Sequence, residues 1–147
     1  MGSELRGDDI AGVWVGEELR NHLIRLGATS IQVFMGGTAP ENLTGEIGRF
    51  LHGADVRASH IALVDAAEME LKPGRIALLT PEKIGGISFS THRLPLSILV
   101  RYFEEMLHCG VTVVGIQPAN TAFGAQPAPA VRKAVDEVVA AFVSVVE

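Results

Sequence analysis

A chain of 147 residues, 48% hydrophobic and 20% charged, is long enough to bury the core of one domain and too apolar to stay disordered. A formal net charge of −5, with no cluster of Lys or Arg, argues against a general binder of nucleic acid. The single cysteine, Cys109, excludes an intramolecular disulfide, and no apolar run is long enough to span a membrane. We therefore expect one domain over residues 1–147, located in the cytoplasm.

The first third of the chain predicts a helix, a strand and a second helix. Apolar residues recur at helical spacing over residues 9–26, with Asp8 available as the N-cap and Gly27 as the stop. The β-forming residues 30–35 predict a strand. The loop GGTAPEN follows it and opens a helix over about residues 42–51.

The rest of the chain alternates strands and helices. Apolar residues 60–64, followed by Asp65, predict a strand buried on both faces, as in parallel sheets. Further elements are expected as a strand at 75–80 hairpinned to or near its predecessor, a helix at 95–107, a strand at 111–119 and a helix at 127–146. This order predicts an α/β domain, a three-layer sandwich whose central sheet is largely parallel and flanked by helices. Ligands of such sheets gather at the carboxyl ends of the strands.

Three side chains fall on that edge of the predicted sheet. They are Asp9 at a helix start, Asp65 at a strand end and His92 in a loop before a helix. Two carboxylates and an imidazole suit an open site for a divalent ion such as nickel or zinc. Each also has an ordinary structural alternative. Asp8 and Asp9 could cap the helix, Asp65 could accept backbone N–H groups, and His92 could form hydrogen bonds within its loop. The residues alone leave these alternatives open.

Other catalytic and binding motifs fit the sequence poorly. No GxSxG supports a triad of Ser90, His92 and Asp65, and neither a Walker loop nor GxGxxG is present. Cys109 and His108 are adjacent at the end of a predicted helix, where their side chains diverge. We therefore expect Cys109 to be a buried structural thiol.

Six short motifs follow one another along the chain: GSELRGDD, GGTAPEN, IALVDAAEM, KPG, STHRLPL and GIQP. In this order they resemble the nickel-iron hydrogenase maturation endopeptidases over nearly the whole chain. The likeness is greatest to the branch that processes the large subunit of hydrogenase 3, the formate hydrogenlyase type. The resemblance implies a cytoplasmic, metal-dependent endopeptidase that removes the C-terminal extension of the [NiFe]-hydrogenase large-subunit precursor after nickel insertion. It also implies that Asp9, Asp65 and His92 ligate the nickel presented by the precursor and are the catalytic residues, while Asp8 caps the helix or supports the site.

Two features depart from the family pattern. Members begin with a buried strand that leads into a glycine-containing turn, whereas Met1 already lies in that turn and Ser3 replaces the usual asparagine. We therefore expect the family's first strand to be missing. The strand before GGTAPEN usually ends in aspartate, but here it ends in Met35. These departures keep open an alternative from another class, a noncatalytic binder of the nickel precursor or an impaired homologue. A flavodoxin-like module that binds a small ligand at the strand-end loops is a third alternative.

Overall fold

The computed structural model describes residues 1–53, 60–89 and 95–146. Its elements in chain order are a 3-10 turn (Gly7–Ile10), α1 (Ala11–Leu26), a second 3-10 turn (Pro40–Leu43), α2 (Thr44–Leu51), β1 (His60–Glu68), β2 (Ile76–Leu79), α3 (Pro81–Ile84), β3 (Ser88–Phe89), α4 (Leu96–Met106), β4 (Gly110–Ile116) and α5 (Pro129–Ser144). Among these described helices, none combines the length and the hydropathy that crossing a membrane requires.

The four strands form one sheet in the order β2-β4-β1-β3. The two central strands, β1 and β4, are parallel and pair from His60 with Gly110 to Ala66 with Ile116. Both outer strands are antiparallel to their neighbours, because β2 pairs with β4 and the short β3 pairs with the end of β1. The expected α/β fold is confirmed, but its sheet is mixed rather than largely parallel, because among the described strands only the central pair runs parallel. β2 lies near β1 with β4 between them.

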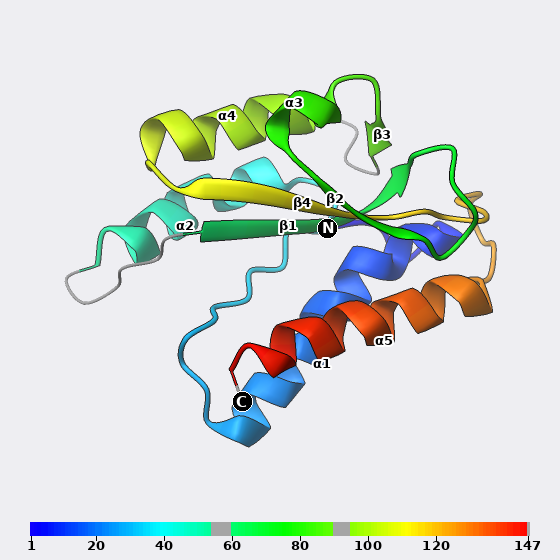
Figure 1. Ribbon diagram of the computed structural model, residues 1–147, viewed down its shortest axis with the longest axis horizontal. Helices are drawn as coiled ribbons and strands as arrows, with labels where there is room; N and C mark the ends of the chain where they lie inside the picture. The colour runs from blue at the N-terminus through cyan, green and yellow to red at the C-terminus, as the bar shows by residue number, and fades with distance from the viewer. Residues whose placement is uncertain (54–59, 90–94, 147) are drawn as a thin grey trace.

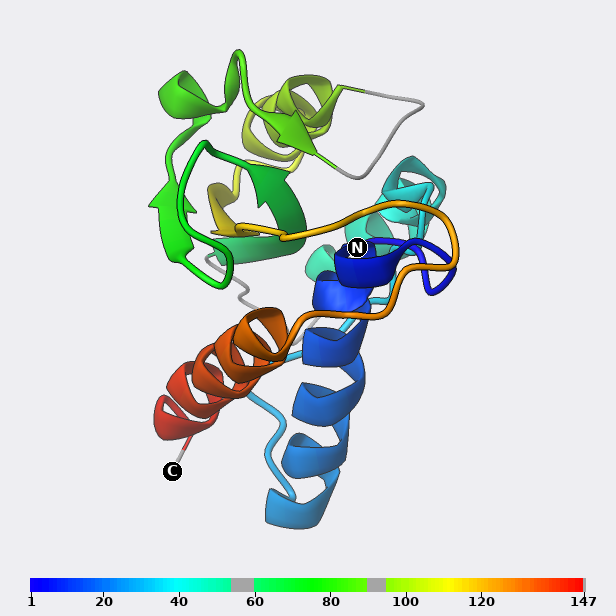
Figure 2. The ribbon, with the colours of Figure 1, turned by 90° about the vertical axis from the view of Figure 1, so that its right-hand side faces the viewer.

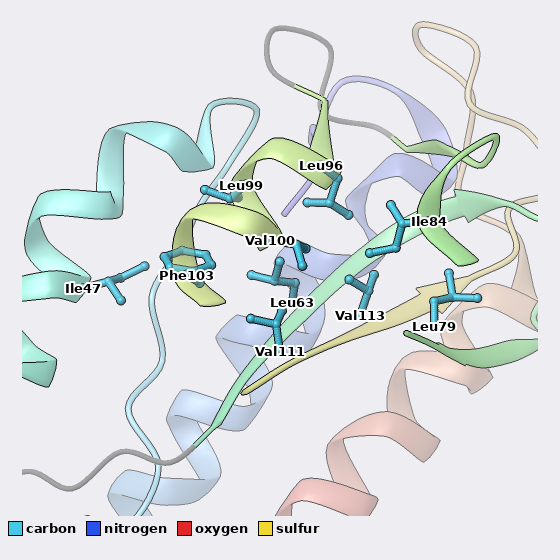
Figure 3. Close-up of a cluster of buried hydrophobic side chains, with 10 residues drawn as sticks. All are labelled: Ile47, Leu63, Leu79, Ile84, Leu96, Leu99, Val100, Phe103, Val111 and Val113. Carbon is cyan, nitrogen blue, oxygen red and sulfur yellow. The ribbon is translucent and has the colours of Figure 1, made fainter. Parts of the chain in front are cut away.

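Helices cover both faces of the sheet, which gives the expected three layers (Figures 1 and 2). On one face, α1 and α5 lie next to each other; on the other lie α2, α3 and α4. Alternation along β4 supplies both cores, since Val111 and Val113 face one cluster while Val114 and Ile116 face the other. Figure 3 shows the first cluster, in which Phe103 packs among aliphatic side chains.

One predicted strand is wrong. Residues 30–35 adopt no strand in the described part of the chain. High β propensity produces a strand only where a neighbouring edge supplies hydrogen-bonding partners. The first two residues of the chain connect β1 to the loop that follows this segment, because the Met1 amine donates to the Val64 carbonyl (2.7 Å) and the Gly2 N–H donates to the Gly37 carbonyl (2.8 Å). The expected absence of the family's first strand stays a prediction.

The strand ends differ from the sequence prediction near the candidate site. β1 continues three residues beyond Asp65 to Glu68, because its last two residues pair with β3. β4 ends at Ile116, so Gln117 begins the following loop. Residues 81–89, which follow the strand predicted at 75–80 and for which no helix or strand is predicted, contain both α3 and β3. β3 has only two residues, so it is too short to show the alternation of apolar and polar residues that predicts a strand.

Candidate functional site

Asp8 does not cap the first helix, and the cap predicted for it is wrong. Its fully buried carboxylate accepts three backbone N–H groups, from Ala119 (2.7 Å), Asn120 (2.9 Å) and Ala128 (2.6 Å). All three donors belong to the loop between β4 and α5, which passes over the N-terminal turn (Figure 2). Within the described residues no side chain caps α1. Asp8 therefore joins the first turn of the chain to a loop more than 100 positions away.

Asp9 follows in the same 3-10 turn and is 3% exposed. Its backbone N–H donates to the Arg6 carbonyl (3.0 Å), which closes the turn. Asp9 lines a small cavity of about 80 Å³ together with Arg6, Glu68 and Phe89. The turn thus places one carboxylate inside the protein and a second, that of Asp9, at a cavity near the ends of β1 and β4.

Asp65 is fully buried within β1. One of its oxygens accepts the N–H of Ala66 (2.9 Å). This is a hydrogen bond of the kind expected if Asp65 has the structural role of accepting backbone N–H groups. Burial lowers the pKa of the Met1 amine, and the charges of Asp65 and then Asp9 act in the opposite direction. Asp9 lines its cavity together with Ala66, the residue directly after Asp65, so the fold brings the turn that carries Asp9 to the strand that carries Asp65.

His92, the third predicted site residue, falls within residues 90–94 and lies outside the described residues, as does Ser90. In the portion of the chain that is described, no three His, Cys, Asp or Glu side chains are grouped to hold a metal ion. The described neighbours on either side, Phe89 and Pro95, both line a larger cavity of about 350 Å³. The assignment of Asp9, Asp65 and His92 as metal ligands and catalytic residues stays a prediction.

Met35, which replaces the usual family aspartate, packs against α1. Its sulfur lies so close to Gly16 that a Cβ added there would be 2.6 Å from it. The glycine leaves room for the thioether, and Val33 lies near the same place. Met35 therefore fills space against a helix, as methionine commonly does in irregular gaps. Cys109 is buried, as expected.

Two polar residues near the site were missed as functional candidates. Gln117 is only 3% exposed, and its amide nitrogen donates to a Glu68 carboxylate oxygen (2.7 Å). Glu68 lines the same small cavity as Asp9. The sequence signal that could have found them is Gln117 in the GIQP motif, directly after a buried strand. A buried amide must find partners for all its polar atoms, so it fixes the polar groups around it.

Comparison with known proteins identifies the family. Residues 13–145 match the HycI family model, described as hydrogenase maturation protease. The hydrogenase 3 maturation protease of Escherichia coli K12 is 31% identical over 124 residues, which are 84% of this chain and 72% of the relative. A Methanocaldococcus jannaschii protein named as a hydrogenase maturation protease is 30% identical over 122 residues, which are 80% of this chain and 69% of that protein. The crystal structure of the [NiFe] hydrogenase maturation protease HycI from Thermococcus kodakarensis has a TM-score of 0.80 at 25% identity and covers 99% of this chain and 87% of that chain.

The fold and these matches define a protease built on an α/β sandwich. The chain belongs to the hydrogenase maturation protease family. The resemblance seen in the six sequence motifs is thereby confirmed.

Proposed function

We propose that the protein is an endopeptidase that removes the C-terminal extension of a nickel-loaded [NiFe]-hydrogenase large-subunit precursor. The protein recognises the precursor by the nickel that the precursor carries. The observation that carries this proposal is the pair of buried carboxylates, Asp9 and Asp65, which come from distant parts of the chain. Asp9 lines a cavity together with Ala66, the residue directly after Asp65. The proposed setting is the cytoplasm, and the proposed partner is the precursor, with no role for nucleic acid or membrane.

The chemistry of the donors fits a divalent ion. Asp9 and Asp65 supply two buried carboxylates, and carboxylate oxygens bind divalent ions readily. Carboxylate oxygens and the imidazole of His92 are ligands that a borderline ion such as nickel accepts. In the proposed complex Asp9, Asp65 and His92 complete the coordination of the precursor's nickel.

This arrangement makes cleavage depend on metal insertion. The three side chains hold the precursor through its nickel and so orient the adjacent peptide bond, which reduces the entropy cost of the reaction. Asp9 or Asp65 then takes the proton of the attacking water as general base. Asp8 contributes by holding the turn that carries Asp9 against the loop at residues 119–128.

The test uses purified protein with nickel-loaded and nickel-free precursor, followed by mass spectrometry. We expect loss of mass at the C-terminus of the loaded precursor only. Asp9→Asn, Asp65→Asn and His92→Ala should each reduce the rate at least 100-fold while circular dichroism stays unchanged, because they remove a ligand or the base. Asp136→Asn is the matched control, since that carboxylate is exposed on α5. Cleavage of nickel-free precursor, or full activity of all three variants, would refute the proposal.

Met35 supports one other candidate function. A thioether packed against Gly16 replaces the carboxylate usual in the family, so a polar group that could position water or substrate is absent at this position. The alternative is a noncatalytic protein that binds the nickel-loaded precursor. Tight binding of the loaded precursor without any loss of mass would favour it, and Met35→Asp would then be expected to restore cleavage.

A further inference from the structure

The Gln117 side chain is held in one orientation by its hydrogen bonds. Its oxygen accepts the backbone N–H groups of Met69 (2.7 Å) and Leu71 (3.2 Å). Its nitrogen donates to Glu68 Oε1 (2.7 Å) and to the Pro118 carbonyl (3.2 Å). An amide has two acceptor positions and two donor hydrogens, so the full hydrogen-bonding capacity of Gln117 is used. Rotating the amide would break all four bonds, and Gln117 is therefore a rigid support for the Glu68 carboxylate.

Glu68 is placed beside the candidate site by the strand that also carries Asp65. It is the last residue of β1, where its backbone pairs with Ser88 of β3. Glu68 and Asp9 line the same cavity. Unlike the buried Asp9, Glu68 is an exposed residue, so its carboxylate is accessible to a bound chain.

The cavity is small and its charged walls are mainly acidic. Its volume of about 80 Å³ has room for a few water molecules or the end of one side chain. Its charged lining residues are Asp9, Glu68 and Arg6, and the Arg6 Nε donates to the Thr121 carbonyl (3.2 Å). Phe89 adds an apolar wall against which methylene groups can pack.

From this geometry we propose that Glu68 is a specificity-determining residue that binds a positively charged side chain of the precursor near the scissile bond. The inference rests on the proposed function for the identity of the partner. A carboxylate held in place by Gln117 binds a cation at little entropy cost, because its orientation is already set. The methylene groups of a lysine or arginine side chain pack against Phe89 while the charged end reaches Glu68.

Glu68→Gln removes the charge and keeps the local support, since its amide oxygen still accepts the hydrogen bond from Gln117. Glu17→Gln is the matched control, because Glu17 is exposed on α1. Binding of nickel-loaded and nickel-free precursor is measured by calorimetry, and cleavage by mass spectrometry, for the wild type and both variants. The same measurements use precursor variants in which each Lys, Arg or His near the scissile bond is replaced in turn by Gln.

We expect Glu68→Gln to raise Kd and KM about tenfold, the loss typical of one hydrogen bond to a charged group, with kcat within twofold. Glu17→Gln should match the wild type. One precursor variant should lose the same tenfold with the wild type and nothing further with Glu68→Gln, because the two changes remove one contact.

The remaining outcomes separate this inference from the proposed function. Tenfold weaker binding with the expected coupling, but no cleavage by the wild type, would overturn the endopeptidase proposal and leave the inference standing. Equal binding by Glu68→Gln and Glu17→Gln would overturn the inference, as would a loss that couples to none of the basic side chains. A wild type that does not bind the precursor would overturn both.

Discussion

Replacing Asp8 tests whether one buried carboxylate holds the first turn and the loop at residues 119–128 together. Its three hydrogen bonds, at 2.6–2.9 Å, all go to backbone N–H groups. Asp8→Asn keeps the size of the side chain but replaces one accepting oxygen with an NH₂ group that cannot accept. The amide can turn so that its remaining oxygen faces Ala119 and Asn120, which leaves the Ala128 N–H opposite the NH₂ group. Either orientation loses at least one bond and the charge that strengthens the others.

The magnitude follows from the number of bonds and their access to water. A hydrogen bond to a charged group contributes about 1.5–3 kcal/mol, so three such bonds set an upper range of about 4.5–9 kcal/mol. Ala119 and Asn120 are exposed residues, and water can satisfy their N–H groups after the change. We therefore expect losses of about 2–3 kcal/mol for Asp8→Asn and about 3–5 kcal/mol for Asp8→Ala in the free energy of unfolding.

Urea unfolding at neutral pH measures these losses, and amide hydrogen exchange locates them. The N–H groups of Ala119, Asn120 and Ala128 should exchange faster in Asp8→Asn, while those in the centre of β4 should change only as far as global stability falls. Asp136→Asn is the control, and an exposed ion pair of its kind contributes at most about 1 kcal/mol. An Asp8→Asn variant within 0.5 kcal/mol of the wild type (about the effect of a surface change), with unchanged exchange in the loop, would refute this account.

Two further changes test the packing around the site. Gly12→Ala should destabilise the fold by about 2 kcal/mol or more in urea unfolding, because the added Cβ would lie 2.2 Å from the Met1 carbonyl oxygen and 2.5 Å from that of Val64. Gly48→Ala, whose Cβ would make only ordinary contact with Leu107, should instead stabilise α2 by about 0.5–1 kcal/mol, and equal effects of the two changes would contradict the close approach. Phe103→Ala should cost about 3–5 kcal/mol by the same measurement, since Phe103 is 1% exposed in the core; a loss below about 1 kcal/mol would show that the packing there is loose.

Local patterns in the sequence predicted most of the helices. Apolar residues such as Val15, Leu19 and Leu23 recur at helical spacing and are buried in α1, and Gly27 ends that helix in a left-handed conformation. The two central strands were found because both faces of β1 and β4 are apolar, which is typical of strands between two helical layers. These features depend on neighbours within a few residues, and such neighbours are visible in the sequence.

The elements that were missed depend on distant parts of the chain. Residues 30–35 have the composition of a strand but no ladder in the described structure, whereas β3 has two residues and exists because it pairs with the end of β1. Asp8 has the sequence position of a helix cap, yet its hydrogen bonds go to a loop near the other end of the chain. Propensity and spacing carry no information on such pairings.

The candidate site shows the same division. The sequence by itself determined the α/β class, the family and the choice of Asp9, Asp65 and His92 as candidates, because these rest on residue types and their order. Only the tertiary structure decided that Asp8 supports a loop, that Asp9 lies at a cavity next to the strand that carries Asp65, and that Gln117 holds Glu68 beside that cavity. Hydrogen bonds and charges act over a few ångströms in space, and folding is what brings such distant residues within that range.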